Sequence, residues 1–150
     1  MANNQIYTSR RAAITKALAD KIKEINGRGV YYQNIAEVSP YLKFWDEVVS
    51  FPAVHLNAGA ETRDYQTGGY KDRFLNVILR LYVNQDSSTE ALDELLQDVE
   101  TVIEDNSVLQ YKDRDGVDQC TQQITVVSID TDEGVLDPLG VAEMLIEVRY

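Results

Sequence analysis

Apolar and polar residues alternate over the segment from Lys71 to Asn84. An extended chain places successive side chains on opposite sides, so this alternation predicts a strand with one buried face. The apolar side consists of Leu75, Val77, Leu79, Leu81 and Val83. The opposite side is mixed and consists of Phe74, Asn76, Ile78, Arg80 and Tyr82. We expect the first face to lie in the core and the second to be open to a contact.

After this strand the apolar spacing changes to a helical period. Ser87 followed by Glu90 matches a capping box, which predicts that a helix starts there. A stripe with helical spacing follows and comprises Leu92, Leu95, Leu96, Val99, Val102 and Ile103. Eight acids and no base lie within residues 86–105, and we expect the acids to cover the outer face of this helix.

Weaker patterns predict the remaining elements. A helix is expected from Ser9 to Asn26, with Thr8 as its N-cap and Gly27 at its end. The other expected strands lie at 30–38, 52–59, 122–130 and 141–150.

The expected order of elements is α-β-β-β-α-β-β, which is not the strict alternation of a doubly wound parallel sheet. Period-two alternation also argues against strands that are buried on both faces. We therefore predict an α+β fold with a mixed, mainly antiparallel sheet of about five strands and two helices packed on one face. With 150 residues the chain is expected to form a single domain, 1–150.

Between two of these strands lies a polar segment, 58–72, that contains three glycines and shows no periodicity. A loop of this length is uncommon in a compact domain unless it is functional or mobile. We predict a long mobile loop here. Extension of the flanking strands into a protruding hairpin is the alternative.

Charge is distributed unevenly along the chain, whose formal net charge is −11. Residues 1–28 carry six bases and two acids, whereas residues 86–105 carry only acids. Oppositely charged helices favour a contact between subunits or with a partner. The alternative is that each helix has a solvated outer face. A chain this acidic is not expected to hold nucleic acid tightly, because phosphate binding needs clustered Lys and Arg.

The compartment is indicated by what the chain lacks. A lone cysteine, Cys120, cannot form an internal disulfide and fits a reducing compartment. No apolar run is long enough to span a membrane, and the N-terminal segment lacks the hydrophobic stretch of a signal peptide. These features predict synthesis and assembly in the cytoplasm.

Candidate catalytic and metal-binding residues are few. The only histidine, His55, lies in an expected strand without a motif that supplies a nucleophile or carboxylate, so a structural position is favoured. The acids from Asp113 to Asp118 resemble an oxygen-rich calcium loop but lack its twelve-residue pattern and closing Glu. An Asp-Gly turn is the favoured interpretation. Because no phosphate-binding glycine loop is found either, no cofactor is expected.

Taken in order, the segments resemble one family of phage proteins. An N-terminal helix leads to SFPAVHLNAGAE, a long loop, DRFLNVILRLYV, the acidic helix STEALDELLQDVETVIED and two further strands. This arrangement resembles the tail terminator (tail completion) proteins of long-tailed bacteriophages, which include the lambda-type minor tail protein family. The likeness covers nearly the whole chain and lies in element order, size and local pattern.

The resemblance implies a structural virion protein rather than an enzyme. In that family a small α/β subunit forms a homohexameric ring at the head-proximal end of the tail. The ring caps the tail tube, ends its polymerisation and forms the tail side of the head-tail joint. The implied partners are other copies of the chain, the tail tube protein and the head-tail connector or head completion protein. DNA would pass through the lumen without specific binding, and no catalytic, cofactor or metal residue is implied.

The residues themselves indicate which surfaces would form such contacts. A basic first helix and an acidic second helix would supply the two different patches that ring closure requires. The segment 58–72 is suited to meet a partner. The expected interface comprises Arg10, Arg11, Lys16, Lys21, Lys23, Arg63, Tyr65, Tyr70, Glu90, Asp93, Glu94 and Asp98.

Two other classes of function remain open at this point. The first is a cytoplasmic acidic protein-binding module or regulator that recognises a basic partner through the second helix. The second, ranked below that module, is an enzyme that acts through His55. A hexamer favours the terminator, whereas a strict monomer with a peptide ligand favours the module.

Overall fold

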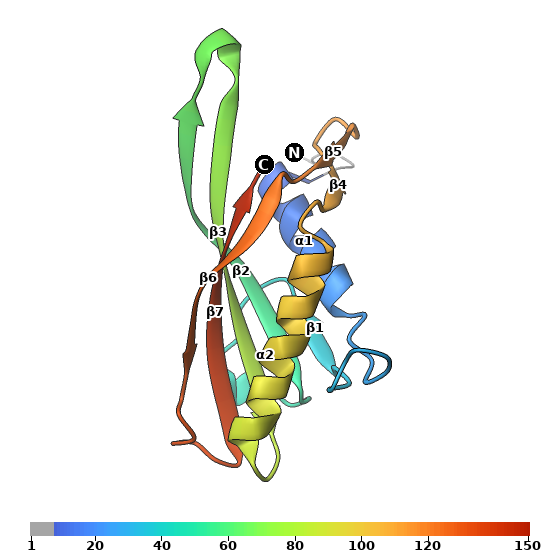
Figure 1. Ribbon diagram of the computed structural model, residues 1–150, viewed down its shortest axis with the longest axis vertical. Helices are drawn as coiled ribbons and strands as arrows, with labels where there is room; N and C mark the ends of the chain where they lie inside the picture. The colour runs from blue at the N-terminus through green and yellow to red at the C-terminus, as the bar shows by residue number, and fades with distance from the viewer. Residues whose placement is uncertain (1–7) are drawn as a thin grey trace, which may run out of the picture.

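The computed structural model describes residues 8–150, apart from the side chain of Trp45. A five-stranded sheet forms its centre, with the strand order β1-β2-β3-β7-β6 (Figure 1). β1 (Glu37–Ser39) runs parallel to β2 (Ala53–Tyr65), and every other neighbouring pair in this sheet is antiparallel. The remaining strands of the sheet are β3 (Lys71–Asn84), β6 (Gln123–Thr131) and β7 (Leu139–Arg149).

Both helices, α1 (Arg10–Ile22) and α2 (Ser88–Asp105), cover the same face of this sheet and share one apolar core with it (Figure 1). The apolar face expected for β3 is confirmed, since all five of its residues are buried. The matching buried positions at the end of the chain are Ala142, Met144, Ile146, Val148 and Tyr150. The predicted α+β fold, with a mainly antiparallel sheet and both helices on one face, is therefore confirmed.

Helix α2 begins near the predicted position, but a different residue satisfies its first turn. Ser87 has a left-handed backbone with a φ of 61° and makes no side-chain capping bond, so the expected capping box is wrong. Asp137 takes this role: its Oδ1 accepts hydrogen bonds from the Ser88 N–H at 3.1 Å and the Ser88 hydroxyl at 2.6 Å. The buried stripe is the predicted one and includes Leu92, Leu95, Leu96, Val99, Val102 and Ile103.

Helix α1 is shorter than predicted. It ends at Ile22 rather than at Asn26. Ser9 rather than Thr8 caps it, by accepting a hydrogen bond from the Ala12 N–H at 3.3 Å. Neither α1 nor any other helix in the described range is long and apolar enough to cross a membrane.

The strand expected at 30–38 is mostly wrong, because only Glu37–Ser39 pairs with β2. The backbone N–H groups of Tyr32 and Gln33 instead donate to the carboxylate of Asp98 on α2. The Asp98 carboxylate thus accepts the hydrogen bonds that these N–H groups would otherwise donate to a neighbouring strand.

The polar segment 58–72 forms strand rather than a long loop. β2 and β3 stay paired out to Tyr65 and Lys71, which leaves only 66–70 as the connection. This hairpin projects beyond the rest of the molecule (Figure 1). Its composition is polar because its outer part has no core to face, and for that reason no apolar alternation marks it. We call residues 59–73 the arm and the rest of the described chain the body.

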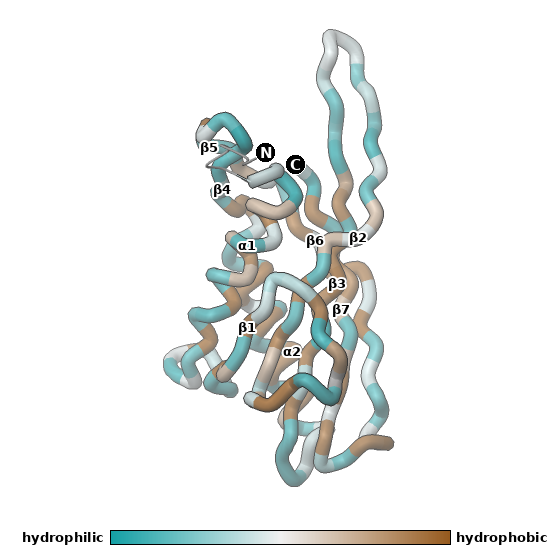
Figure 2. Tube along the Cα trace, turned by 180° about the vertical axis from the view of Figure 1, so that it is seen from behind, coloured by the Kyte–Doolittle hydropathy of each residue, from teal (hydrophilic) through white to brown (hydrophobic). Residues whose placement is uncertain are grey.

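The smaller elements complete the body. A second sheet pairs β4 (Gln110–Lys112) with β5 (Asp118–Cys120), and the sequence pattern does not predict either strand. Two 3₁₀ turns lie at Trp45–Glu47 and, in the tip of the arm, at Thr67–Gly69. Figure 2 shows that apolar positions gather in the body, whereas the arm is mostly polar.

Candidate assembly interface

The arm ends in a tight connection that leaves its tip in solvent. The Gln66 N–H donates to the Tyr70 carbonyl at 2.7 Å, and Gly68 and Gly69 have positive φ angles of 82° and 83°. Tyr65 and Tyr70 are 69% and 76% exposed. Tyrosines are enriched among the residues that dominate the energy of protein interfaces. The tip is therefore suited to bind a partner.

The two faces of the arm differ in charge. Glu61 lies opposite Leu75, whose side chain is in the core, so alternate residues beyond this pair point to the helix side. The helix-side face carries Arg63, Tyr65, Lys71 and Arg73. The other face carries Thr62, Asp64, Asp72 and Phe74. The arm is thus basic on one face only.

The basic face of the arm continues into a recess at its root. The recess has a volume of about 350 Å³, and its arginines are Arg10, Arg11, Arg63, Arg73 and Arg114. These residues come from α1, from both strands of the arm and from the β4–β5 connection, so only the fold brings them together. We call these five residues the arginine cluster.

Tyr150 also lines this recess and holds two of the arginines. The guanidinium carbons of Arg10 and Arg73 lie 5.0 Å and 5.4 Å from the centre of its ring, within reach of a cation–π interaction. Its hydroxyl donates to Glu61. Burial, together with this bond to a carboxylate, raises the pKa of Tyr150 to about 12. The phenol therefore stays neutral, and the site keeps its positive charge.

Three members of the arginine cluster have no acidic partner. Arg10 donates to the neutral hydroxyl of Tyr111 at 3.0 Å and 2.8 Å, and Arg11 donates to a backbone carbonyl. Within residues 8–150, neither of them forms an ion pair within 4.0 Å, and the same holds for Arg73 and Lys71. The other two members are paired, Arg63 with Glu61 at 2.8 Å and Arg114 with Asp115 at 3.9 Å. The uncompensated positive charge of the arm and its root is therefore that of Arg10, Arg11, Arg73 and Lys71.

The outer face of α2 has the opposite character. Glu90 and Asp93 are exposed, and Glu94 is half-buried and accepts a hydrogen bond from Gln33 Nε2 at 2.7 Å. No carboxylate of α2 forms an ion pair with a residue in the described part of the chain. This face is therefore a negative surface that has no cationic partner in the part of the chain that the structure describes.

Asp98 does not belong to that surface. The expectation that it points outward is wrong, since the side chain is completely buried. Its carboxylate accepts hydrogen bonds from the Tyr32 N–H at 2.9 Å and the Gln33 N–H at 2.8 Å. Burial raises the pKa of this carboxyl, although the two N–H donors act in the opposite direction. Asp98 thus holds the segment before β1 against α2, and we leave it out of the interface.

The bases of α1 divide into two groups. Arg10 and Arg11 lie at the start of the helix, in the arginine cluster. Lys21 and Lys23 lie at the other end, where each faces an acid three residues away at 3.9 Å and 3.5 Å. Exposed pairs of this kind contribute little to stability. Lys16 is exposed between the two groups. The structure therefore gathers only part of the basic residues that the sequence indicates.

Arg73 and Arg114 join the arginine cluster although the sequence does not select them as interface residues. Arg73 lies directly opposite Arg63 because β2 and β3 are in register. That register becomes visible only when the segment 58–72 is recognised as a hairpin. A pair of bases flanking a glycine-containing turn is the signal that would have found it.

The candidate catalytic residue His55 is buried on β2, away from solvent. Its Nε2 lies 3.6 Å from Glu37 Oε2, and neither ring nitrogen has a hydrogen-bond partner among the described residues. Burial lowers the pKa of His55, although Glu37 acts in the opposite direction. Lys43 Nζ donates a hydrogen bond to the other oxygen of Glu37, Oε1, at 2.5 Å. This geometry suits a packed, neutral side chain.

The acidic loop between β4 and β5 is a turn stabilised by its own side chain. Asp113 Oδ1 accepts hydrogen bonds from the N–H groups of Asp115 at 2.9 Å and Val117 at 3.0 Å, which gives the predicted Asp-Gly turn. In the described part of the chain, no group of three or more His, Cys, Asp or Glu side chains is placed to hold a metal ion.

Known proteins resemble this chain over nearly its full length. The family model described as bacteriophage tail tube terminator protein matches residues 8–150. The chain is also similar to a tail tube terminator protein of Escherichia phage T5. The two share 32% identity over 149 residues, which cover 93% of this chain and 92% of the relative. This protein belongs to the bacteriophage tail tube terminator family.

Proposed function

We propose that this protein is a structural component of the virion that caps the tail tube as a homohexameric ring. The ring would end polymerisation of the tube and form the tail side of the head-tail joint. The observation that carries this proposal is that one subunit has two surfaces of opposite charge, the arginine cluster and the outer face of α2. In the cluster, Arg10, Arg11 and Arg73 form no ion pair with a described residue. Membership of the terminator family supports the role.

A ring of identical subunits needs a heterologous contact, in which two different patches of the same chain meet. The arginine cluster of one copy would face Glu90 and Asp93 of the next copy. Arg10, Arg11 and Arg73 would then gain the acidic partners that they lack among the described residues, whereas Arg63 and Arg114 already pair with Glu61 at 2.8 Å and Asp115 at 3.9 Å. Arginine is suited to this contact because its guanidinium binds carboxylates with defined geometry.

The other partners follow from the same role. The ring would contact the tail tube protein on one side and the head-tail connector or head completion protein on the other. It would be assembled in the host cytoplasm and remain at the head-proximal end of the tail. DNA passing through the lumen would meet subunits with a net charge of −11, which disfavours tight phosphate contacts. The role requires no cofactor and no catalytic step.

Tail tube polymerisation tests this proposal. Purified tube protein is polymerised with the wild-type chain, with a Glu90→Lys/Asp93→Lys variant, and with a matched Asp46→Lys/Glu47→Lys control. The control reverses two exposed acids outside α2. We expect the wild type and the control to stop elongation and the α2 variant to fail, while all three unfold at the same temperature. Continued growth of tubes with bound wild-type protein, or equal termination by the α2 variant, would overturn the proposal.

A further inference from the structure

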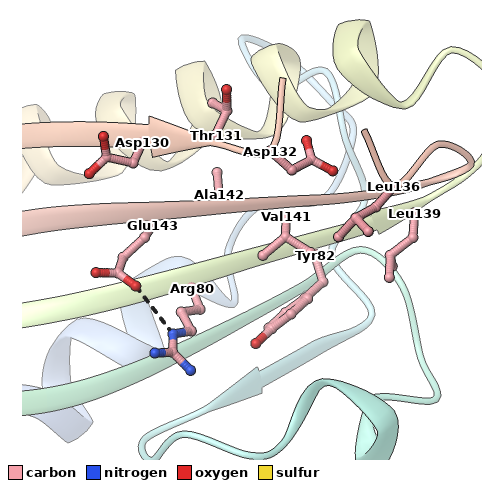
Figure 3. Close-up of a pocket in the computed structure, with 10 residues that line it drawn as sticks. All are labelled: Arg80, Tyr82, Asp130, Thr131, Asp132, Leu136, Leu139, Val141, Ala142 and Glu143. Carbon is pink, nitrogen blue, oxygen red and sulfur yellow. Dashed lines mark hydrogen bonds and ion pairs between the residues drawn. The ribbon is translucent and has the colours of Figure 1, made fainter. Parts of the chain in front are cut away.

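A groove on the sheet face opposite the two helices takes no part in the charge contact described above. It has a volume of about 630 Å³ and lies along β7, beside the end of β6 and the β6–β7 connection (Figure 3). The apolar side chains that line it are Tyr82, Leu136, Leu139 and Val141. Leu136 is 49% exposed. An apolar groove that is open to solvent is a candidate binding site.

The edge of this groove is acidic. Asp130, Asp132 and Glu143 lie around the apolar side chains (Figure 3). Arg80 Nε forms an ion pair with Glu143 Oε2 at 3.4 Å and with neither aspartate. The Oδ2 atom of Asp132 is buried and has no hydrogen-bond partner among residues 8–150. Asp130 and Asp132 therefore have no cationic partner within residues 8–150.

The tip of the arm has the complementary properties. Tyr65 and Lys71 lie opposite each other on the basic face, and Lys71 Nζ is 5.6 Å from the centre of the Tyr65 ring. Lys71 forms no ion pair with any described residue. The tip thus offers one apolar ring next to one uncompensated cation, and the groove offers apolar surface next to two uncompensated anions.

A subunit cannot make this contact with itself. The arm projects from one end of the molecule, and the β6–β7 connection that borders the groove lies at the opposite end (Figure 1). Tip and groove are nevertheless present on every copy. A contact between them is heterologous, as the proposed ring requires.

We propose that the Tyr65–Lys71 face of the arm of one copy binds in the β6–β7 groove of a neighbouring copy. The Tyr65 ring packs on Leu136, Leu139 and Val141, and the Lys71 ammonium lies between Asp130 and Asp132. This inference rests on the proposed ring and specifies a second contact within it. It also explains the arm, since a two-stranded hairpin is marginally stable alone in water.

Disulfide trapping tests the contact. In a Cys120→Ser background, the single variants Tyr65→Cys and Leu136→Cys are mixed and oxidised, both as free protein and on tail tubes. The matched control replaces Tyr65→Cys by Asp64→Cys, which is adjacent in sequence but on the other face of the arm. A disulfide forms only where the two Cα atoms approach within about 7 Å. We expect the Tyr65 pair to cross-link at least tenfold faster than the Asp64 pair.

Two results of this trapping experiment would overturn the inference. One is equal trapping of the two pairs, or none, in both states. The other is a disulfide from Tyr65→Cys to a cysteine introduced in the tube protein, which would show that the arm binds the tube instead.

A charge exchange provides a second measurement that does not depend on cysteine chemistry. Lys71→Glu and Asp130→Lys each place like charges at the contact, and each should weaken self-association about tenfold or more. The double variant restores opposite charges and should recover most of the loss. Additive losses in the double variant would overturn the inference.

The two proposals fail in different ways. If tubes are terminated but tip and groove never cross-link, only the contact assigned here is wrong. If copies cross-link through tip and groove but tubes continue to grow, the contact is right and the terminator role is wrong.

Discussion

The body and the arm use the same two strands but are stabilised in different ways. In the body half of β3, the core side chains from Leu75 to Val83 are 0–1% exposed. In the arm, every residue from 62 to 71 is exposed. The body is therefore held by apolar burial, whereas the arm has little besides its own hydrogen bonds. Regular strand structure does not by itself tell which part of a sheet serves stability and which serves binding.

The part of the sheet held by apolar burial meets the part held by its own hydrogen bonds at the root of the arm. The register of β2 against β3 shifts between Ala58 and Glu61, just where the core ends. Backbone bonds between Arg73 and Tyr150, at 3.1 Å and 2.9 Å, fix the arm to the end of the chain. The arginine cluster lies at this junction, so a partner bound there would also restrain the arm.

The largest effect is expected from a cavity in the body. Leu79→Ala removes a fully buried side chain beneath both helices and should lower the free energy of unfolding by about 2–5 kcal/mol. Urea denaturation followed by circular dichroism measures this loss. A loss below about 1 kcal/mol would show that the sheet face is less tightly packed than the structure indicates.

A smaller effect is expected from the buried carboxylate that holds the segment before β1. Asp98→Ala leaves the N–H groups of Tyr32 and Gln33 without their acceptor and should cost about 2 kcal/mol. Asp93→Ala, on the exposed face of the same helix, is the matched control and should cost less than about 0.5 kcal/mol. Equal costs for the two variants would contradict the assignment of Asp98 to the interior.

The body should also lose stability in mild acid because of His55. Its folded-state pKa lies below 6.5, so the unfolded chain binds the proton first as the pH falls. Stability is then lost below pH 6.5, by at most about 1.4 kcal/mol per pH unit, until the folded histidine also titrates. Glu37, whose pKa is lowered chiefly by its bond from Lys43, acts in a separate window below 4.5.

Denaturation of the wild type and of His55→Gln between pH 7 and about pH 5 checks this contribution. In His55→Gln the free energy of unfolding should fall less steeply as the pH is lowered, because the contribution of the histidine is removed. The same slope in both proteins would show that His55 is not responsible.

The smallest effect on stability is expected at the tip of the arm. Tyr65→Ala should change the free energy of unfolding by less than about 0.5 kcal/mol, because the ring is mostly exposed in the subunit. The same variant should reduce self-association by tenfold or more in analytical ultracentrifugation. A variant that loses stability but assembles normally would reverse the roles assigned to arm and body.

The parts of the fold that could be predicted from the sequence are those with a core on one side. Alternation around Leu79 gives the buried face of β3, and helical spacing around Leu95 gives that of α2. Asp98 also lies three residues from Leu95 and four from Val102, on the buried side of the helix. The spacing of Asp98 predicts a buried position, whereas the charge of its side chain predicts an exposed one.

The arm and the arginine cluster could not be predicted in the same way. Strand pairing in the outer arm buries neither face, so the sequence there shows no alternation of apolar and polar residues. Arg10, Arg63 and Arg114 are far apart in the chain, and only the fold places them around one recess. The apolar groove depends likewise on the path of the β6–β7 connection past Tyr82. Sites of this kind depend on tertiary placement that a single sequence does not state.

The mass in solution tests the central claim most directly. Light scattering behind a sizing column, at low and at high salt, should give a species of about six times the 17.0 kDa subunit mass. High salt should weaken it, because screening reduces the attraction between the arginine cluster and α2. A monomer at every concentration in solution, together with only monomers after cross-linking of the protein bound to tail tubes, would contradict a ring closed by these surfaces.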